Sequence, residues 1–87
     1  MIELNDETDP MLFSVEIPSG KLVCQYMEIV SAMQGIIPTG TEPNQTHIVR
    51  AIRECTRTPE VAAAASDHVL TAAWARMTRA VQAAGNG

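Results

Sequence analysis

The chain has few of the residues from which catalytic and structural sites are usually built. Its 87 residues include two cysteines, two histidines, three aromatic residues and a single lysine. Cys24 and Cys55 are far apart in the sequence, and two separate thiols are more typical of a reducing cytoplasm than of a disulfide framework. We interpret both as small buried apolar residues.

The same scarcity argues against a metal centre and against catalysis. A structural zinc site usually takes its ligands from closely spaced pairs, but Cys24, His47, Cys55 and His68 are well separated. Nucleophilic catalysis needs a thiol or hydroxyl beside a base, and no local pattern brings such residues together. No glycine-rich phosphate loop precedes a predicted helix. The sequence therefore predicts a protein that is not an enzyme and binds no cofactor or metal.

Long hydrophobic runs are also missing. No apolar stretch approaches the roughly 20 residues that span a bilayer, and the acidic N-terminus does not resemble a signal peptide. We therefore expect a cytoplasmic protein. Its 46% apolar content is enough for one small folded domain, but much of it is alanine, which buries little area. Homo-oligomer formation is therefore left open as a way to bury more surface.

Charge is divided unevenly along the chain. Residues 1–42 carry seven acidic residues and one lysine, a net of −6, whereas residues 43–87 carry five arginines and three acidic residues, a net of +2. Such polarity can steer association, head to tail with a second copy or with another protein. The overall charge of −4 makes nucleic acid an unlikely partner.

The N-terminal quarter predicts a tail followed by a hairpin. Residues 1–10 are acidic, end in a proline and predict a flexible tail, after which residues 11–85 form a single small domain. Residues 12–17 alternate apolar and polar side chains, residues 18–20 form a turn, and residues 21–25 return. The resulting hairpin over residues 12–25 must pack on helices, because an isolated hairpin is marginal in water.

Four helices are predicted after the hairpin, at about residues 26–34, 44–56, 59–65 and 67–84. Gly35 and Gly85 are placed to end the first and the last helix. Thr58 and Pro59 are typical of a helix start, as cap and first helical residue. The predicted fold class is therefore α+β, mostly helical, with an N-terminal β-hairpin packed on three to four α-helices.

Candidate partner-binding residues fall into three groups. The first is an isoleucine pair after the first helix, and the second is three arginines at i, i+3 and i+7, which would share the outer face of the second helix. The third is a tryptophan and a methionine in the apolar stripe of the last helix, which fits either a core or a helix-in-groove contact. These candidates are Ile36, Ile37, Arg50, Arg53, Arg57, Trp74 and Met77.

The layout from Asp9 to Ala84 resembles that of small tail assembly chaperones encoded by long-tailed bacteriophages. Residues 12–25 (LFSVEIPSGKLVCQ) are similar to the strand, turn and strand with which such proteins often open. Residues 58–77 (TPEVAAAASDHVLTAAWARM) are similar to their capped, alanine-containing helix and the start of a long final helix. One departure is Cys24-Gln25, where related proteins often have an acidic helix cap.

The resemblance implies a chaperone that coats a long helical tape measure protein and recruits tail tube subunits in the host cytoplasm. It also implies a longer form, made by ribosomal frameshift, that extends beyond Gly87. Two alternatives stay open from the residues themselves. One is a small nucleic-acid-binding regulator that uses the arginine face, and the other is a self-assembling structural subunit of a phage particle.

Overall fold

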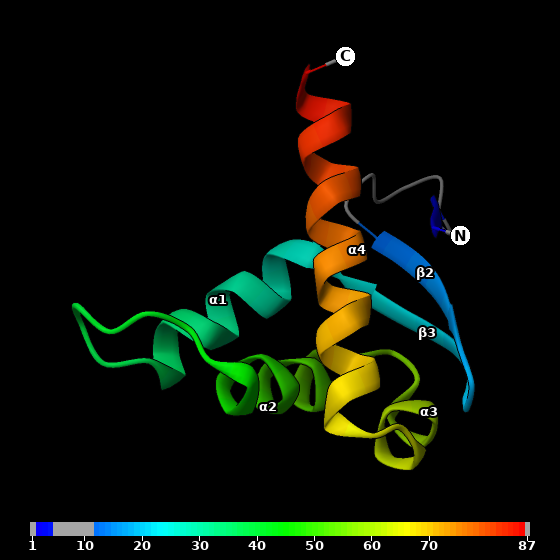
Figure 1. The fold of residues 1–87 in the computed structure, drawn as a ribbon, viewed down its shortest axis with the longest axis horizontal. Helices are drawn as coiled ribbons and strands as arrows, with labels where there is room; N and C mark the ends of the chain where they lie inside the picture. Colours follow the sequence, from blue (N-terminus) through cyan, green and yellow to red (C-terminus); the bar gives the residue numbers. More distant parts are fainter. Residues whose placement is uncertain (1, 5–11, 87) are drawn as a thin grey trace.

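A computed structural model describes residues 2–4 and 12–86 of the chain, in which strands precede helices (Figure 1). This order confirms the predicted α+β class, with an N-terminal hairpin followed by four helices. The strands are β1 (Ile2–Leu4), β2 (Leu12–Ile17) and β3 (Gly20–Gln25), and the helices are α1 (Tyr26–Ile36), α2 (Gln45–Cys55), α3 (Pro59–Ala64) and α4 (Asp67–Asn86).

The strands form one antiparallel sheet in the order β1-β2-β3. In the hairpin, Val15 pairs with Leu22, and Ile17 pairs with Gly20 across the tight turn. Gly20 has a φ of +137°, a conformation that side chains disfavour, and a Cβ there would lie 3.3 Å from Val61. The Ser19 hydroxyl donates to the Val61 carbonyl over 3.0 Å, so the hairpin tip is tied to α3.

Strand β1 lies in the segment that the sequence predicted to be a flexible tail. Ile2–Leu4 pairs with β2 in antiparallel register, for example Glu3 with Ser14. A strand of three residues is too short to show the alternation of apolar and polar side chains that predicts a strand. Strand β1 is therefore recognised only from its pairing with the edge of β2. The other residues of the predicted tail lie outside the described part of the chain.

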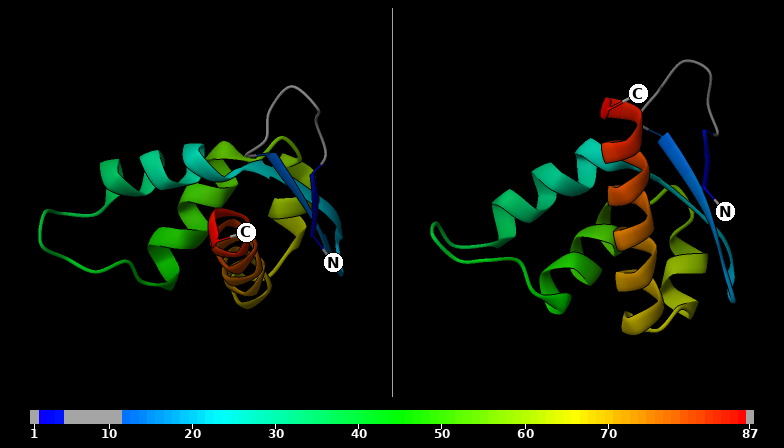
Figure 2. Two further views of the ribbon diagram at one scale, coloured as in Figure 1. Left: turned by 90° about the horizontal axis from the view of Figure 1, so that it is seen from above. Right: turned by 45° about the horizontal axis from the view of Figure 1, so that its top comes forward.

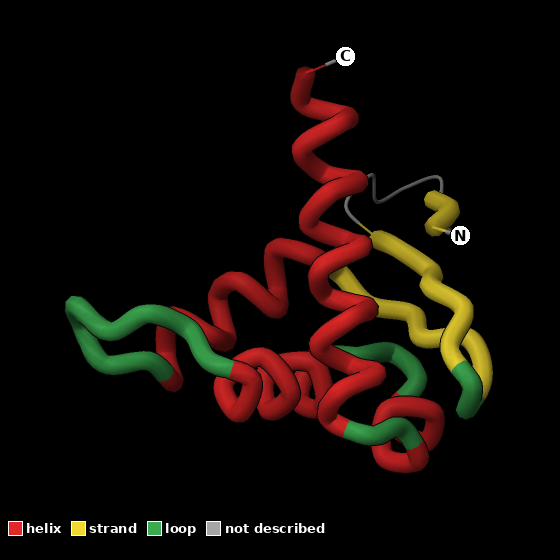
Figure 3. The backbone as a smooth tube through the Cα atoms, in the orientation of Figure 1, coloured by secondary structure: helices red, strands yellow, loops and turns green. Residues whose placement is uncertain are grey.

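The helices pack on one face of the sheet, with α4 crossing the middle of the molecule (Figures 2 and 3). Alternate residues of β2 and β3 point into this layer and meet apolar residues of all four helices. The buried core comprises Phe13, Val15, Ile17, Leu22, Cys24, Ile29, Met33, Val49, Ala51, Ile52, Ala62, Ala65, Leu70, Ala73 and Met77.

Two predicted helix stops are wrong. Helix α1 continues through Gly35 to Ile36, and Ile37 is the extended C-cap residue, whose N–H donates to the Met33 carbonyl over 2.8 Å. Pro38 explains this end, because a residue before proline is disfavoured in the helical conformation. Helix α4 likewise runs through Gly85 to Asn86. Glycine permits a left-handed stop but does not require one.

Candidate protein-binding groove

A groove of about 430 Å³ lies between the second half of α1 and the loop that follows it. Helix α1 packs on the core through Ile29 and Met33, and the loop after it extends outward on the left of Figure 1; we call residues 26–44 the α1 arm. Every residue that lines the groove is uncharged, and most are apolar. The lining consists of Val30, Met33, Gln34, Ile37, Pro38, Thr39, Thr41 and Pro43.

Helix periodicity and loop geometry together build this groove. Val30, Met33 and Ile37 are spaced by three and four residues, so they share one side of α1 and its cap. The loop then turns back, where the Thr41 N–H donates to the Pro38 carbonyl over 3.0 Å. Gly40 takes a φ of +83° within this turn, a value that favours glycine.

The charged residues close to the groove in the sequence are acidic. Residues 22–49 contain Glu28 and Glu42 but no lysine or arginine. Glu42 is exposed and lies between Thr41 and Pro43, which both line the groove. An apolar ligand that carries a lysine or arginine would therefore match both the lining and Glu42 beside it.

The two candidate isoleucines differ in one respect. Both are half-buried against the core, but only Ile37 also lines the groove. Sequence reasoning placed a contact point in this loop but missed Val30 and Gln34. The available signal was the helical spacing of Val30 with Ile37 ahead of a loop that contains two prolines.

The three candidate arginines do not form one outer face. Arg50 lies 3.5 Å from Glu54 on the exposed side of α2. Helix α2 ends at Cys55, so Arg57 lies beyond it and does not follow the helical spacing; its backbone N–H donates to the Val23 carbonyl over 2.8 Å. The predicted arginine face is therefore wrong, because the third arginine is not in the helix.

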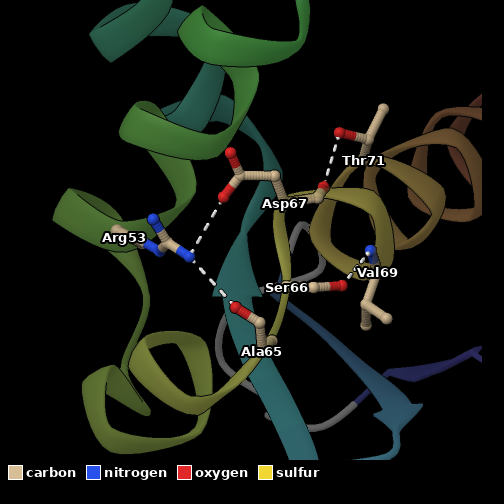
Figure 4. A network of polar contacts seen from close by, with 6 residues as sticks. All are labelled: Arg53, Ala65, Ser66, Asp67, Val69 and Thr71. Carbon is tan, nitrogen blue, oxygen red and sulfur yellow. Dashed lines mark hydrogen bonds and ion pairs between the residues drawn. The ribbon is translucent and has the colours of Figure 1, made fainter.

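Arg53 instead joins α2 to the start of α4 (Figure 4). Its Nη2 donates to the Ala65 carbonyl over 3.0 Å and lies 3.2 Å from an Asp67 carboxylate oxygen. Ser66 accepts a hydrogen bond from the Val69 N–H, while the Thr71 hydroxyl donates to the Asp67 carbonyl. These contacts hold the α3–α4 junction, so the guanidinium of Arg53 has a structural role.

The two candidates on α4 differ in burial. Met77 is fully buried, and its sulfur accepts a contact from the Cys24 thiol at 3.5 Å. Trp74 is half-buried and stacks on Tyr26, with ring centroids 4.9 Å apart and planes 6° from parallel. Met77 is thus a core residue and not a surface contact, and Trp74 packs at the edge of the core.

The two cysteines and His47 occupy structural positions. Burial raises the pKa of the Cys24 thiol to about 12. Burial, and then the carboxylates of Glu28 and Glu54, raise the pKa of Cys55, so both thiols are protonated at neutral pH. His47 caps α2 reciprocally with Asn44: the His47 N–H donates to Asn44 Oδ1, and the Asn44 N–H donates to His47 Nδ1.

Within residues 2–4 and 12–86, no group of three or more histidine, cysteine, aspartate or glutamate side chains could hold a metal ion. Over the same described residues, none of the helices combines the length and apolarity that crossing a bilayer demands.

Comparisons with known proteins do not indicate a function, so we infer function from the groove. No protein-family model matches the chain. A search of curated proteins found no significant match, and a search of solved structures found none either.

Proposed function

We propose that this chain is a non-catalytic protein-interaction domain that shields an apolar helical segment of a partner protein. The uncharged groove on the α1 arm supports this proposal most directly. Solvent-accessible apolar grooves on small domains commonly receive the apolar face of a helix, whose side chains enter at helical spacing. The volume of about 430 Å³ suits a few aliphatic side chains of one such face.

Within this class, we propose a tail assembly chaperone of a long-tailed bacteriophage, acting in the host cytoplasm. This finer assignment rests on the resemblance of residues 12–25 and 58–77 to such proteins. Its expected partners are a long helical tape measure protein and tail tube subunits. A chaperone of this kind needs to bind apolar helical segments without chemistry, which is the task for which the groove is suited.

The experiment is affinity capture of the full chain from the cell that produces it, followed by intact and peptide mass spectrometry. Three forms are compared: the unchanged chain, Gln34→Lys and Ser31→Lys. Gln34 is exposed and lines the groove, so its replacement places a charge there. Ser31 is exposed on the same helix but does not line that groove, so Ser31→Lys is the matched control.

We expect a long, mainly helical protein to be captured by the unchanged chain and by Ser31→Lys, and to be lost with Gln34→Lys. A longer form of the chain, extended past Gly87, would further support the chaperone assignment. Equal capture by all three forms would rule out the groove as the binding site. Recovery of nucleic acid in place of a protein would overturn the proposal in favour of the regulator.

A further inference from the structure

The two walls of the groove are held to different degrees. One wall is helix α1, which is anchored to the core through the buried side chains of Ile29 and Met33 and also packs along α2. The other wall is the loop of residues 38–43, which supplies half of the lining residues and in which every residue is exposed. We call residues 38–43 the strap. The groove therefore has one wall fixed by the core and one wall that faces solvent.

The strap has few hydrogen bonds. Among the described residues, its only hydrogen bond is the internal one from the Thr41 N–H to the Pro38 carbonyl over 3.0 Å. No hydrogen bond or ion pair in the same part of the chain joins the strap to another helix or strand. Exposed segments with so few bonds open at the lowest free energy within a fold. The strap is therefore the wall of the groove that can change position most easily.

The two ends of the strap, by contrast, are held in place. Ile37 caps α1 through its N–H, and Asn44 caps α2 through its reciprocal bonds with His47. Between these ends, Gly40 takes a φ of +83°, which glycine adopts at no steric cost. A few residues that absorb a backbone change are enough to close a segment over a ligand. The strap can therefore bend at its middle while both helices keep their structure.

We propose that the strap closes over the segment that occupies the groove, while α1 stays in place. Thr39, Thr41 and Pro43 would then cover apolar side chains that rest on Val30 and Met33. Closure removes additional apolar surface of the bound segment from water, which strengthens binding, and it fits the groove to side chains of different size. Ordering the strap costs part of this gain, so binding should be moderate in affinity and tolerant of sequence. The inference rests on the proposed function, because closure needs an apolar occupant.

The probe is a synthetic helical peptide with leucine at positions i, i+3, i+4 and i+7 and with alanine, glutamine and lysine elsewhere. Its control peptide replaces the leucines by glutamine. Amide exchange with solvent, measured by NMR on the full chain, reports the strap at Thr39, Gly40, Thr41 and Glu42, the strap residues that have an N–H. We expect these amides to exchange rapidly in the free chain and at least about tenfold more slowly with the leucine peptide bound. The amides of α1 should change little.

Two alanine substitutions then separate closure from groove binding. An added Cβ meets no packed neighbour within 4 Å at either Gly35 or Gly40, but only Gly40 has a positive φ. Gly40→Ala relieves the resulting strain by leaving the turn, so it should weaken binding of the leucine peptide by about five- to thirtyfold in calorimetry. Gly35→Ala should bind the peptide as the unchanged chain does, and the NMR spectra confirm that each variant is folded.

The outcomes distinguish the two proposals. If the leucine peptide does not bind, or if Gln34→Lys binds it as well as the unchanged chain, both the groove and the strap are overturned. If the peptide binds in the groove but the strap amides exchange as before, or if Gly40→Ala binds equally well, closure alone is overturned and the groove remains. Slower exchange with the glutamine peptide would also contradict closure over an apolar segment.

Discussion

Replacing Thr56 by valine should lower the free energy of unfolding by about 2 kcal/mol. The Thr56 hydroxyl donates to the Val23 carbonyl over 2.7 Å and accepts from the Thr58 N–H over 3.1 Å. The Thr58 hydroxyl in turn accepts from the Val23 N–H over 3.0 Å. We call this pair the threonine clamp. It satisfies both backbone groups of Val23 on the outer side of β3 and ties the sheet to the segment between α2 and α3.

The magnitude follows from the groups that lose partners. In Thr56→Val the Val23 carbonyl keeps the Arg57 N–H, but the part-buried Thr58 N–H loses its acceptor. One lost hydrogen bond costs about 0.5–1.5 kcal/mol and an unsatisfied donor about 1–3, the latter reduced here because water can approach. Thr58→Val leaves the Val23 N–H without its acceptor, at about 1–2 kcal/mol by the same reasoning.

The two effects should not add. The hydroxyls of Thr56 and Thr58 also lie within hydrogen-bond distance of each other, at 3.1 Å. The double valine variant should therefore be destabilised by about 0.5–1 kcal/mol less than the sum of the single variants. A domain of this size has a total stability of only about 4–13 kcal/mol, so each change is a measurable fraction.

Urea unfolding, followed by circular dichroism and by Trp74 fluorescence, measures these differences. Thr78→Val is the control, because the Thr78 hydroxyl donates to the Trp74 carbonyl within α4, and we expect it to change stability by less than about 0.5 kcal/mol. If Thr56→Val matched that control, the clamp would contribute nothing to stability. Strict additivity of the two valines would show that they act independently.

Four further predictions concern core packing, the Arg53–Asp67 ion pair and the Cys24 thiol. Met77→Ala should lower the free energy of unfolding by about 2–5 kcal/mol, because Met77 is fully buried. A double-mutant cycle on Tyr26 and Trp74 should give a coupling energy of about 0.5–1.5 kcal/mol for the stacked rings. Urea unfolding measures both. Asp67→Asn should change thermal stability by less than about 1 kcal/mol, because the Arg53 pair is exposed to solvent; a larger loss would contradict this. Burial raises the pKa of Cys24 from 9.0 to about 12, so the unfolded chain loses this proton at a lower pH than the folded protein does. The free energy of unfolding should therefore be unaffected by Cys24 below pH 9 and fall by about 1.4 kcal/mol per pH unit between pH 9 and about 12. In Cys24→Ala this slope of the free energy of unfolding against pH should be absent.

The helices and the hairpin could be predicted because their signals are local. Alternation over residues 12–17 and helical spacing from Tyr26 onward need no knowledge of the rest of the fold. The first helix end was misplaced because two local signals competed. Gly35 offered a stop, but Pro38 set the actual one by excluding the helical conformation at Ile37.

The arginine face could not be predicted, because a tertiary contact ends α2. Thr56 is the extended C-cap residue, and its hydroxyl bonds to Val23 on a strand more than 30 residues earlier. Extending the helical spacing past Cys55 therefore placed Arg57 on a face that does not exist. The three-residue strand β1 was missed for a related reason, since its pairing partner is not adjacent in sequence.

The groove lies beside Ile37, one of the predicted contact residues, and not at Trp74 or Met77, which were also predicted. Trp74 and Met77 are three residues apart on one apolar stripe of the helix, so periodicity alone predicts the same burial for both. Only the element across from each decides burial: Met77 meets Cys24 in the core, and Trp74 meets Tyr26 at its edge. Ile37 is half-buried against the core and also lines the groove, because Pro38 ends the helix there and the loop turns back beside it. A groove therefore arises where a local stop signal, and not a distant contact, shapes the backbone.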